Sequence, residues 1–345
     1  MATITIAPEI LRTFLTSLFI AEGVDPLPAD AIYRNMVWSE LAGRSNYGLE
    51  RVPIHVRRLR AGVMSGADAT TIHELGPSLV RVDGGGGPGQ YAAERAMAAA
   101  VDRSRETGIG IAGVRASNSF GPAAYYICQA AEAGMISMVF GNSFPKVAAH
   151  GGRLPVFGTN PMAFGAPRRN GEHILIDMAT SALSGSTVTQ VGNEGHELPA
   201  GIAIDSEGRP ATSHKNVTAL LPFGGAKGFG LSLMVEILAG VLTGAGLTKG
   251  VASIFSDFTR NGNNGHFMVV INVGRWLPIE LFSERLEILV DEIRASGDGV
   301  RIPGETRWES IRRLTREGIP VVHGTWRQIA ALASESGLVP PKLAA

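Results

Sequence analysis

An arginine and a tyrosine four residues apart have side chains that could carry out chemistry together. Arg51 can bind a carboxylate through two parallel hydrogen bonds, and the phenol of Tyr47 can donate a proton. A free phenol has a pKa of about 10, so it needs a nearby cation to act near neutral pH. If residues 47–51 are helical, Arg51 shares a face with Tyr47 and supplies that cation. The alternative is that Arg51 extends a solvated basic face with Arg57 and Arg58.

Three further segments have the composition of binding loops. The turn at 158–161 offers hydroxyl and amide groups to a ligand. Residues 177–181 follow a predicted strand and present backbone N–H groups and small hydroxyls, which suit a pyrophosphate. Residues 224–230 form a glycine-rich loop that opens a predicted helix, whose N-terminus favours anions, and Lys227 adds a positive charge. The alternative for Lys227 is an ordinary solvated lysine.

Two stretches match the glycine pattern of dinucleotide-binding turns, at 84–89 and at 108–113. Two matches carry little weight in a chain with 44 glycines among 345 residues. The second match precedes a predicted strand instead of a helix, and the first lacks a clear βαβ unit with an acidic residue at the required distance. We therefore do not expect a Rossmann-type site.

The composition excludes several classes of partner. Lys plus Arg and Asp plus Glu both number 31, so the formal net charge is zero, and neither nucleic acid nor an anionic membrane is an expected partner. Cys128 is the single cysteine, which excludes an internal disulfide and a cysteine-based zinc site, and we expect no bound metal. The first twenty residues lack the features of a signal peptide, so a cytoplasmic location is expected. The apolar stretch 229–247 contains Glu236, which favours a buried helix over a membrane span.

The order of predicted elements divides the chain into three parts. Apolar residues with helical spacing mark the start, for example Leu11, Phe14, Leu15 and Leu18. The middle alternates helices with strands, among them 162–166, 174–178 and 266–272, while 187–205 is polar and predicted to be a loop. The last third is helical again. We expect residues 1–75 and 276–345 to pack together as a helical dimerisation domain, and residues 76–275 to form a mixed-sheet domain.

A set of motifs, in order along nearly the whole chain, resembles the type 2 malate/L-lactate dehydrogenase family. The motifs are LAGRSNYGLERVP at 41–53, NSFG at 118–121, GGR at 151–153, GTNPMAF at 158–164, DMATS at 177–181, LPFGGAKGFG at 221–230, GHF at 265–267 and PGE at 303–305. The family includes sulfolactate, ureidoglycolate and diketogulonate dehydrogenases and reductases of cyclic imino acids.

The resemblance implies a fold, a cofactor and site residues. The fold class is α/β, a non-Rossmann mixed sheet with flanking helices and a helical domain built from both chain ends, assembled as a homodimer. The cofactor is NAD or NADP, and the substrate is a small carboxylate clamped by Arg51. Ser119 would face the same pocket as a hydroxyl donor. The implied cofactor-binding residues are Thr159, Asn160, Asp177, Met178, Ala179, Thr180, Ser181, Ala226, Lys227, Gly304 and Glu305.

This chain departs from the family where protons and charges are handled. The family usually has a proton-donating histidine where Tyr47 stands, and another where Ser119 stands. A lysine expected shortly after 177–181 is Thr187, and the residue before Lys227, commonly histidine, is Ala226.

Three hypotheses follow from these departures. Tyr47 substitutes as the acid; or the substrate is a cyclic imine that arrives already protonated and needs no enzymic acid; or Tyr47 only packs. The first two give an NAD(P)-dependent oxidoreductase that transfers a hydride to or from the 2-position of a 2-hydroxy or 2-keto acid or a cyclic 2-imino acid. The third gives a diverged NAD(P)-binding protein with altered or no dehydrogenase activity.

Overall fold

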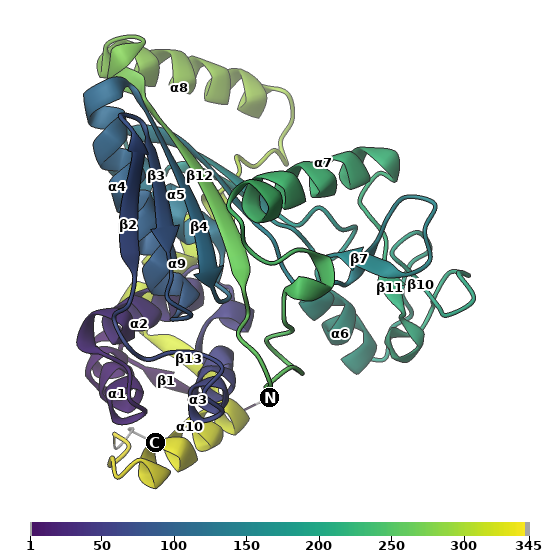
Figure 1. Ribbon diagram of the computed structural model, residues 1–345. Helices are drawn as coiled ribbons and strands as arrows, with labels where there is room; N and C mark the ends of the chain where they lie inside the picture. Colours follow the sequence, from purple (N-terminus) through teal and green to yellow (C-terminus); the bar gives the residue numbers. More distant parts are fainter. Residues whose placement is uncertain (1, 342–345) are drawn as a thin grey trace.

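The computed structural model describes residues 2–341 and centres on a mixed seven-stranded sheet (Figure 1). The strands, in spatial order, are β2 (Thr71–Gly76), β3 (Leu79–Asp83), β4 (Ile109–Ser117), β12 (Asn264–Asn272), β5 (Met135–Gly141), β8 (Met162–Ala166) and β9 (Ile174–Met178). Within this sheet only β3 and β4 pair in parallel, and the other neighbours are antiparallel. The architecture is therefore mixed α/β, and it differs from the mostly parallel Rossmann sheet.

The central strand, β12, shows why the sheet is buried on both faces. Met268 and Val270 point into a core shared with helices α4 (Gly89–Thr107) and α5 (Ala123–Glu132). Phe267 and Val269 point to the other face, where α7 (Ala226–Glu236) packs. Successive side chains alternate between the faces of a strand, so a strand covered on both sides must be apolar throughout.

The two chain ends form one helical unit. Strand β1 (Thr3–Ile6) pairs antiparallel with β13 (Ile319–Val322). Around this pair lie α1 (Pro8–Ala21), α2 (Pro26–Leu41), α3 (Val52–Arg60) and α10 (His323–Glu335), whose apolar side chains share one core that includes Leu15, Ile32, Val56 and Ile329. The helical domain expected from both ends is thus present, while the boundaries at 75 and 276 stay a prediction.

Two helices follow β12 before the chain returns to that unit. Helix α8 (Ile279–Ala295) lies along one end of the sheet, and α9 (Glu305–Glu317) packs Trp308 against the sheet core (Figure 1). The Trp308 indole N–H donates to the carbonyl oxygen of His173, immediately before β9, at 2.8 Å. This contact places the start of α9 beside the edge strand of the sheet.

A second, four-stranded sheet lies beside the first, in the order β10 (Ala203–Ile204), β11 (Ala219–Leu220), β6 (Val147–Ala148) and β7 (Pro155–Phe157). Here the loop predicted over 187–205 is wrong for residues 187–193, which belong to α6 (Gly185–Asn193), whereas residues 194–202 do form a loop. The Ser184 hydroxyl caps this helix by accepting from the Thr187 N–H at 3.1 Å. Val188 is buried against Val147. So short an apolar stripe among polar residues is easily missed in a sequence.

The glycine turn at 84–89 joins β3 to β4 through α4, so a βαβ unit exists there after all. The turn is nevertheless filled by protein. The Asn118 amide donates to the carbonyl oxygens of Gly86 and Gly87, at 2.9 and 2.8 Å, and a Cβ on Gly89 would clash with the Asn118 carbonyl oxygen. The N–H groups of Gly86 and Gly87 donate to the Ala116 and Gly84 carbonyl oxygens, at 2.8 and 2.9 Å, so they are not free to bind a phosphate group.

The apolar stretch 229–247 is only partly buried. It divides between α7 and the π-helical segment η4 (Ile237–Leu242), with Val235 and Ala239 buried and Val241 and Leu242 exposed. Across residues 2–341, none of the helices has the length and apolarity needed to cross a membrane.

Candidate active site

Tyr47 and Arg51 lie in two consecutive 3-10 turns, η1 (Ser45–Tyr47) and η2 (Leu49–Arg51), that follow α2. The buried Glu40 carboxylate accepts from the Leu49 N–H at 2.7 Å and fixes the turns. The Arg51 guanidinium carbon lies 5.8 Å from the centre of the Tyr47 ring. The two side chains therefore meet as predicted, although through 3-10 turns and not through a regular α-helix.

Arg51 also meets residues far away in the sequence. Its guanidinium carbon lies 4.5 Å from the centre of the Phe255 ring, and its Nε donates to the Asn46 carbonyl oxygen at 2.6 Å. The Lys146 ammonium lies 5.6 Å from the same ring and 5.2 Å from the Phe144 ring. Within residues 2–341, no carboxylate forms an ion pair with Arg51 or Lys146. Two cations and two phenyl rings thus line one half-buried site.

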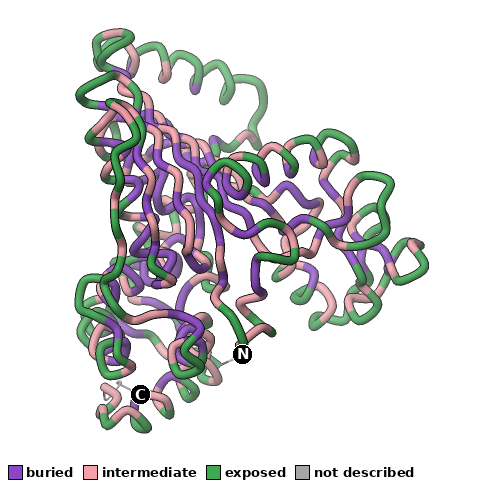
Figure 2. Tube along the Cα trace, viewed as in Figure 1, coloured by how far each residue is buried: buried purple, intermediate pink, exposed green. Residues whose placement is uncertain are grey.

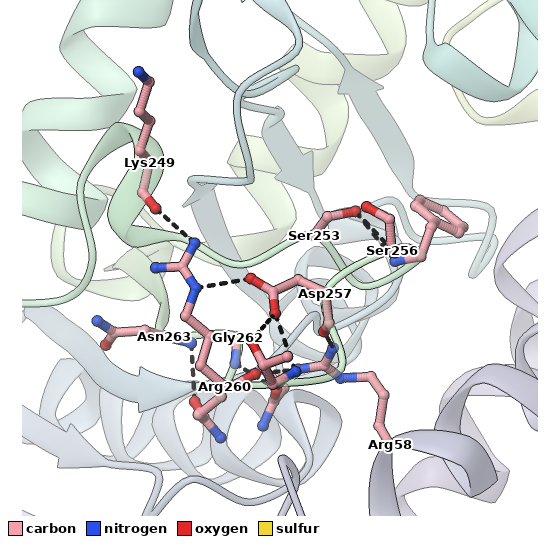
Figure 3. Close-up of polar contacts among 12 residues, drawn as sticks. Arg58, Lys249, Ser253, Ser256, Asp257, Arg260, Gly262 and Asn263 are labelled. Carbon is pink, nitrogen blue, oxygen red and sulfur yellow. Dashed lines mark hydrogen bonds and ion pairs between the residues drawn. The ribbon is translucent and has the colours of Figure 1, made fainter. Parts of the chain in front are cut away.

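The loop that carries Phe255 is held by a deeply buried arginine, Arg58 of α3 (Figure 3). Its guanidinium donates to the carbonyl oxygens of Asp257 and Arg260, at 2.7 and 3.3 Å, and to the Asn118 side-chain oxygen at 3.4 Å. Arg58 is 1% exposed, so the expectation of a solvated basic face is wrong at this position. Instead of facing solvent, Arg58 ties the helical unit to the loop that covers Arg51.

The electrostatic surroundings of Tyr47 differ from the sequence-based expectation. Burial raises the pKa of the Tyr47 phenol, and the nearby Asp177 carboxylate raises it further. Arg51, Arg44 and Arg307 act in the opposite direction but do not outweigh burial. The expected lowering of this pKa by Arg51 is therefore wrong in its net sign, and Tyr47 stays protonated well above neutral pH.

Residues 177–181, together with the segments 158–161 and 222–227, form what we call the cradle. Most polar side chains of 177–181 are hydrogen-bonded within the protein. The half-buried Asp177 carboxylate accepts from the Ala124 N–H at 3.1 Å and lies 3.5 Å from Arg307. The Thr180 hydroxyl donates to the Thr159 and Asn160 carbonyl oxygens, both at 3.1 Å. The Ser181 hydroxyl donates to the Leu183 carbonyl oxygen at 2.7 Å. Residues 177–181 therefore have backbone groups, and not these side chains, to offer a ligand.

The three binding segments predicted from the sequence do come together. The Phe223 N–H donates to the Thr180 carbonyl oxygen at 3.1 Å, and the Thr180 N–H donates to the Thr159 carbonyl oxygen at 2.9 Å. Ser181 forms an isolated bridge with Pro222. The segments at 158–161 and 177–181 thus lie beside Pro222 and Phe223, the two residues that directly precede the predicted loop at 224–230.

Asn160 holds this cradle against α7. Its backbone is in the left-handed region with φ of 34°, and its side chain is completely buried. The amide donates to the Glu236 carboxylate at 2.8 Å and to the Ser232 carbonyl oxygen at 3.2 Å. We therefore assign the Asn160 side chain to positioning instead of to direct ligand contact.

The N-terminus of α7 is open to a ligand. Gly224 and Gly225 have φ of 56° and 62°, values that favour glycine, and they turn the chain sharply into the helix. Ala226 and Lys227 are exposed at the first turn. The Lys227 and Gly228 N–H groups donate to the Gly224 and Phe223 carbonyl oxygens, at 3.4 and 2.9 Å, so they are used within the turn. The exposed Lys227 ammonium is the group of this segment that suits a phosphate.

The last predicted motif borders the same strand, β9. Leu175 donates through its N–H to the Pro303 carbonyl oxygen at 3.0 Å, and a Cβ on Gly304 would lie 2.9 Å from the His173 carbonyl oxygen. The Glu305 carboxylate accepts from the Ile302 N–H at 3.0 Å and from Arg294 at 2.5 Å. The Glu305 carboxylate is therefore hydrogen-bonded at the start of α9 and to Arg294, while its backbone lies beside the cradle.

Within the described residues, no hydrogen bond links Ser119 to the other catalytic candidates. It lies half-buried in the loop between β4 and α5, and among the described residues no hydrogen bond joins its hydroxyl to Tyr47 or Arg51. Its proximity to the substrate pocket stays a prediction.

Two features of the site were missed from the sequence. Lys146 is 95 positions from Arg51, and only the tertiary fold brings it to Phe255. A cavity of about 490 Å³ between the end of α2 and α9 is the other. It is lined by Ala42, Gly43, Arg44, Thr306, Arg307, Glu309, Ser310 and Arg313. Thr306 directly follows the predicted motif at 303–305, which was the available signal.

The fold and the cradle define a dehydrogenase outside the Rossmann class, and comparisons with known proteins identify the family. The model of the malate/L-lactate dehydrogenase family matches residues 6–330. The chain belongs to this family, which confirms the resemblance seen in the motifs.

Individual relatives match over the whole length. An L-sulfolactate dehydrogenase of Methanothermobacter thermautotrophicus is 34% identical over 336 residues, which is 96% of each chain. A Delta(1)-pyrroline-2-carboxylate/Delta(1)-piperideine-2-carboxylate reductase of Pseudomonas syringae is 33% identical over 96% of this chain and 97% of the relative. The structure of a malate dehydrogenase from Pyrococcus horikoshii is similar with a TM-score of 0.89 and 30% identity, covering 98% of this chain and 97% of that one.

Proposed function

We propose that this protein is an NAD(P)-dependent oxidoreductase that transfers a hydride to or from the 2-position of a small 2-hydroxy or 2-keto acid or cyclic 2-imino acid. The observation that carries the proposal is Arg51, a half-buried guanidinium without a carboxylate partner among the described residues. A 2-keto, 2-hydroxy or 2-imino acid supplies the carboxylate that such a group binds in two-point fashion.

The cradle at 158–161, 177–181 and 222–227 would hold the cofactor. When bound, the nicotinamide donates or accepts the hydride. Lys227, exposed at the start of α7, would bind a phosphate group through its charge, beside the backbone of 177–181. We assign the cavity beside Thr306 to the same cofactor, because the Arg44 guanidinium there forms no ion pair within residues 2–341 and so favours an anion. Arg307 and Arg313 of the same lining are paired with Asp177 and Glu317.

Tyr47 would supply the proton in the reductive direction. Hydride transfer to a carbonyl produces an alkoxide, which is a stronger base than a phenolate. A phenol whose pKa is raised by burial keeps its proton at neutral pH and can give it to that alkoxide. The same shift leaves little phenolate at neutral pH to act as the base in the oxidation.

Replacing Tyr47 by phenylalanine tests this role. We expect Tyr47→Phe to lower kcat for 2-keto acids about 10²- to 10⁴-fold, the usual contribution of a general acid, with a much smaller loss for cyclic imino acids that are already protonated. The wild-type kcat should not vary across neutral to mildly alkaline pH, because the pKa of Tyr47 is raised. Steady-state rates across this pH range provide the measurement. Full keto-acid turnover by the variant would show that Tyr47 only packs.

Replacing Lys227 tests the cofactor site. Lys227→Ala should weaken binding of the reduced cofactor about five- to tenfold, a modest loss because the side chain is exposed. Cofactor fluorescence in a titration without substrate gives the dissociation constant. Lys215→Ala removes an exposed lysine elsewhere and serves as the matched control. Identical cofactor affinities in the two variants would show that Lys227 is an ordinary solvated lysine.

The activity itself is tested by loss of reduced-nicotinamide absorbance. Purified protein is mixed with NADH or NADPH and with a panel of 2-keto acids or of cyclic 2-imino acids. Turnover on either panel establishes the reaction and its preferred cofactor. Absence of turnover on both, with cofactor binding shown by fluorescence, would favour a second function, that of a diverged NAD(P)-binding protein. The observation that supports this alternative is Tyr47 itself, a phenol with a raised pKa at the family's histidine position.

We further propose that the protein is a cytoplasmic homodimer. Helix α8 and its approach expose large apolar side chains, among them Trp276 (77%), Ile288 (57%) and Leu289 (54%), and Figure 2 shows the helix exposed along most of its length. On the same helix Val290 is buried, whereas Leu289 and Ile293 are exposed. A second copy of the chain would cover such a face. A single buried cysteine agrees with a reducing compartment.

A further inference from the structure

Lys146 is a positively charged group that the proposed mechanism does not use. Two backbone hydrogen bonds fix its main chain. The Lys146 N–H donates to the Phe157 carbonyl oxygen at 2.7 Å, and the Lys146 carbonyl oxygen accepts from the Leu220 N–H at 2.8 Å. The side chain is half-buried, and within residues 2–341 it forms no hydrogen bond or ion pair. A lysine held in this way needs a reason for its position, since its ammonium would be better hydrated outside the site.

The position of Lys146 relative to Arg51 supplies that reason. Both cations lie against the Phe255 ring, at 4.5 Å for Arg51 and 5.6 Å for Lys146. Phe144 contacts Phe255 edge to face, with ring centres 5.9 Å apart, and closes the other side of Lys146. Two half-buried like charges that contact one ring repel each other. An anion bound between or beside them would offset this repulsion.

The pKa directions agree with an uncompensated pair. Burial lowers the pKa of Lys146, and Arg51 lowers it further. Burial also lowers the pKa of Arg51, against smaller opposing effects of Tyr47 and Glu50. Both cations would therefore gain from binding an anion.

We propose that Lys146 is a second anion-binding residue of the substrate pocket, and that the substrate is a short 2-oxo or 2-hydroxy acid with a second acidic group. This inference rests on the proposed function, in which Arg51 holds the first carboxylate. Lys146 would bind the second carboxylate or sulfonate, and Phe255 would contact the carbon chain between the two acidic groups. The same two cations disfavour a protonated cyclic imine, which brings a positive charge of its own.

The ammonium of Lys146 is also a possible proton donor, and the two roles have different signatures. An anion-binding residue acts on substrates that carry the second acidic group. A proton donor acts on every substrate of the reaction and cannot be replaced by arginine, which keeps its proton. The test below therefore compares substrates as well as variants.

The central experiment measures kcat/KM for oxaloacetate and for 2-oxobutyrate in wild type, Lys146→Gln and Lys146→Arg, with Lys215→Gln as the control. We expect the wild type to prefer the diacid. Lys146→Gln should lower kcat/KM for the diacid about 10- to 100-fold more than for the monoacid, mainly through KM, and Lys146→Arg should retain most of the preference. Equal losses on both substrates, with kcat abolished in both variants, would assign proton transfer to Lys146 and overturn the proposal. An unchanged preference in Lys146→Gln would overturn it as well.

A second variant keeps the charge and moves it. A Cβ at Gly185 would lie 2.6 Å from the Lys146 nitrogen, at the flexible end of the side chain, so Gly185→Ala should displace the ammonium without unfolding the protein. We expect a partial loss of the diacid preference. Wild-type preference in Gly185→Ala together with loss in Lys146→Gln would show that charge alone matters and that the proposed position does not.

Binding without turnover separates this inference from the proposed function. In the presence of the cofactor, malonate should raise the melting temperature of the wild type more than acetate does, and Lys146→Gln should abolish the difference. Such a result in a protein that reduces neither substrate would support the second anion site while contradicting the proposed reaction. Equal effects of malonate and acetate on the wild type would overturn the second anion site whatever the activity.

Discussion

Replacing Arg51 by alanine should lower kcat/KM about 10³-fold for every substrate that the protein turns over. The guanidinium is the proposed carboxylate clamp, and removing one partner of a close, desolvated charge pair costs about 2–5 kcal/mol. Because the clamp holds the carboxylate in both the ground state and the transition state, KM should rise along with any fall in kcat. Steady-state kinetics over a wide substrate range measure both effects.

Two controls make this result specific. Arg51→Lys keeps the charge but loses the two-point geometry, so it should recover only about tenfold over alanine. Binding of the reduced cofactor should be unchanged in both variants, because Arg51 contacts Tyr47, Asn46 and Phe255 and not the cradle. A kcat/KM for Arg51→Ala within a few-fold of the wild type would remove the observation on which the proposed function rests.

The second large effect is expected on stability. Arg58→Leu should lower the free energy of unfolding by about 3 kcal/mol, because the change leaves the Asp257 and Arg260 carbonyl oxygens without the donor they have now. The Asn118 side-chain oxygen loses one of its two donors and keeps the Gly262 N–H. In a chain of this size the melting temperature should fall by about 4 °C. Thermal unfolding followed by circular dichroism is the direct measurement.

The neighbouring arginine is the matched control. Arg57 is exposed, and its guanidinium carbon lies 3.7 Å from the centre of the Phe258 ring in the same loop. Arg57→Leu should therefore cost no more than about 1 kcal/mol. Arg58→Leu should also raise KM, because the loop it holds carries Phe255 to Arg51. Equal melting temperatures for the two variants would contradict the anchoring role of Arg58.

Much of the fold was predictable because burial leaves a periodic trace. Strands β8 and β9 lie at the residues predicted, and β12, whose sequence was too apolar for an edge strand, lies at the centre of the sheet. Helix α6 was missed because its apolar face is short and its first turn is stabilised by a Ser184 cap amid polar residues. The burial of Arg58 was missed because an arginine that binds backbone carbonyl oxygens looks, in a sequence, like any solvated arginine.

The candidate site was predictable to the extent that its residues are close in sequence. The neighbours Tyr47 and Arg51 were paired correctly, and the family motifs located the segments of the cradle. The sign of the Tyr47 pKa shift was not predictable, because it depends on burial and on Asp177, 130 positions away. Lys146 was missed for the same reason: its relation to Arg51 exists only in three dimensions.

The most direct test of the central claim follows the hydride itself. Reduced nicotinamide cofactor carrying deuterium at the transferring carbon is incubated with the protein and its best 2-keto acid, and the product is analysed by mass spectrometry. The account predicts a 2-hydroxy acid with one deuterium at carbon 2, formed by the wild type and reduced about 10³-fold in Arg51→Ala. A 2-hydroxy acid without deuterium, or no product from any 2-keto or 2-imino acid while the cofactor still binds, would contradict it.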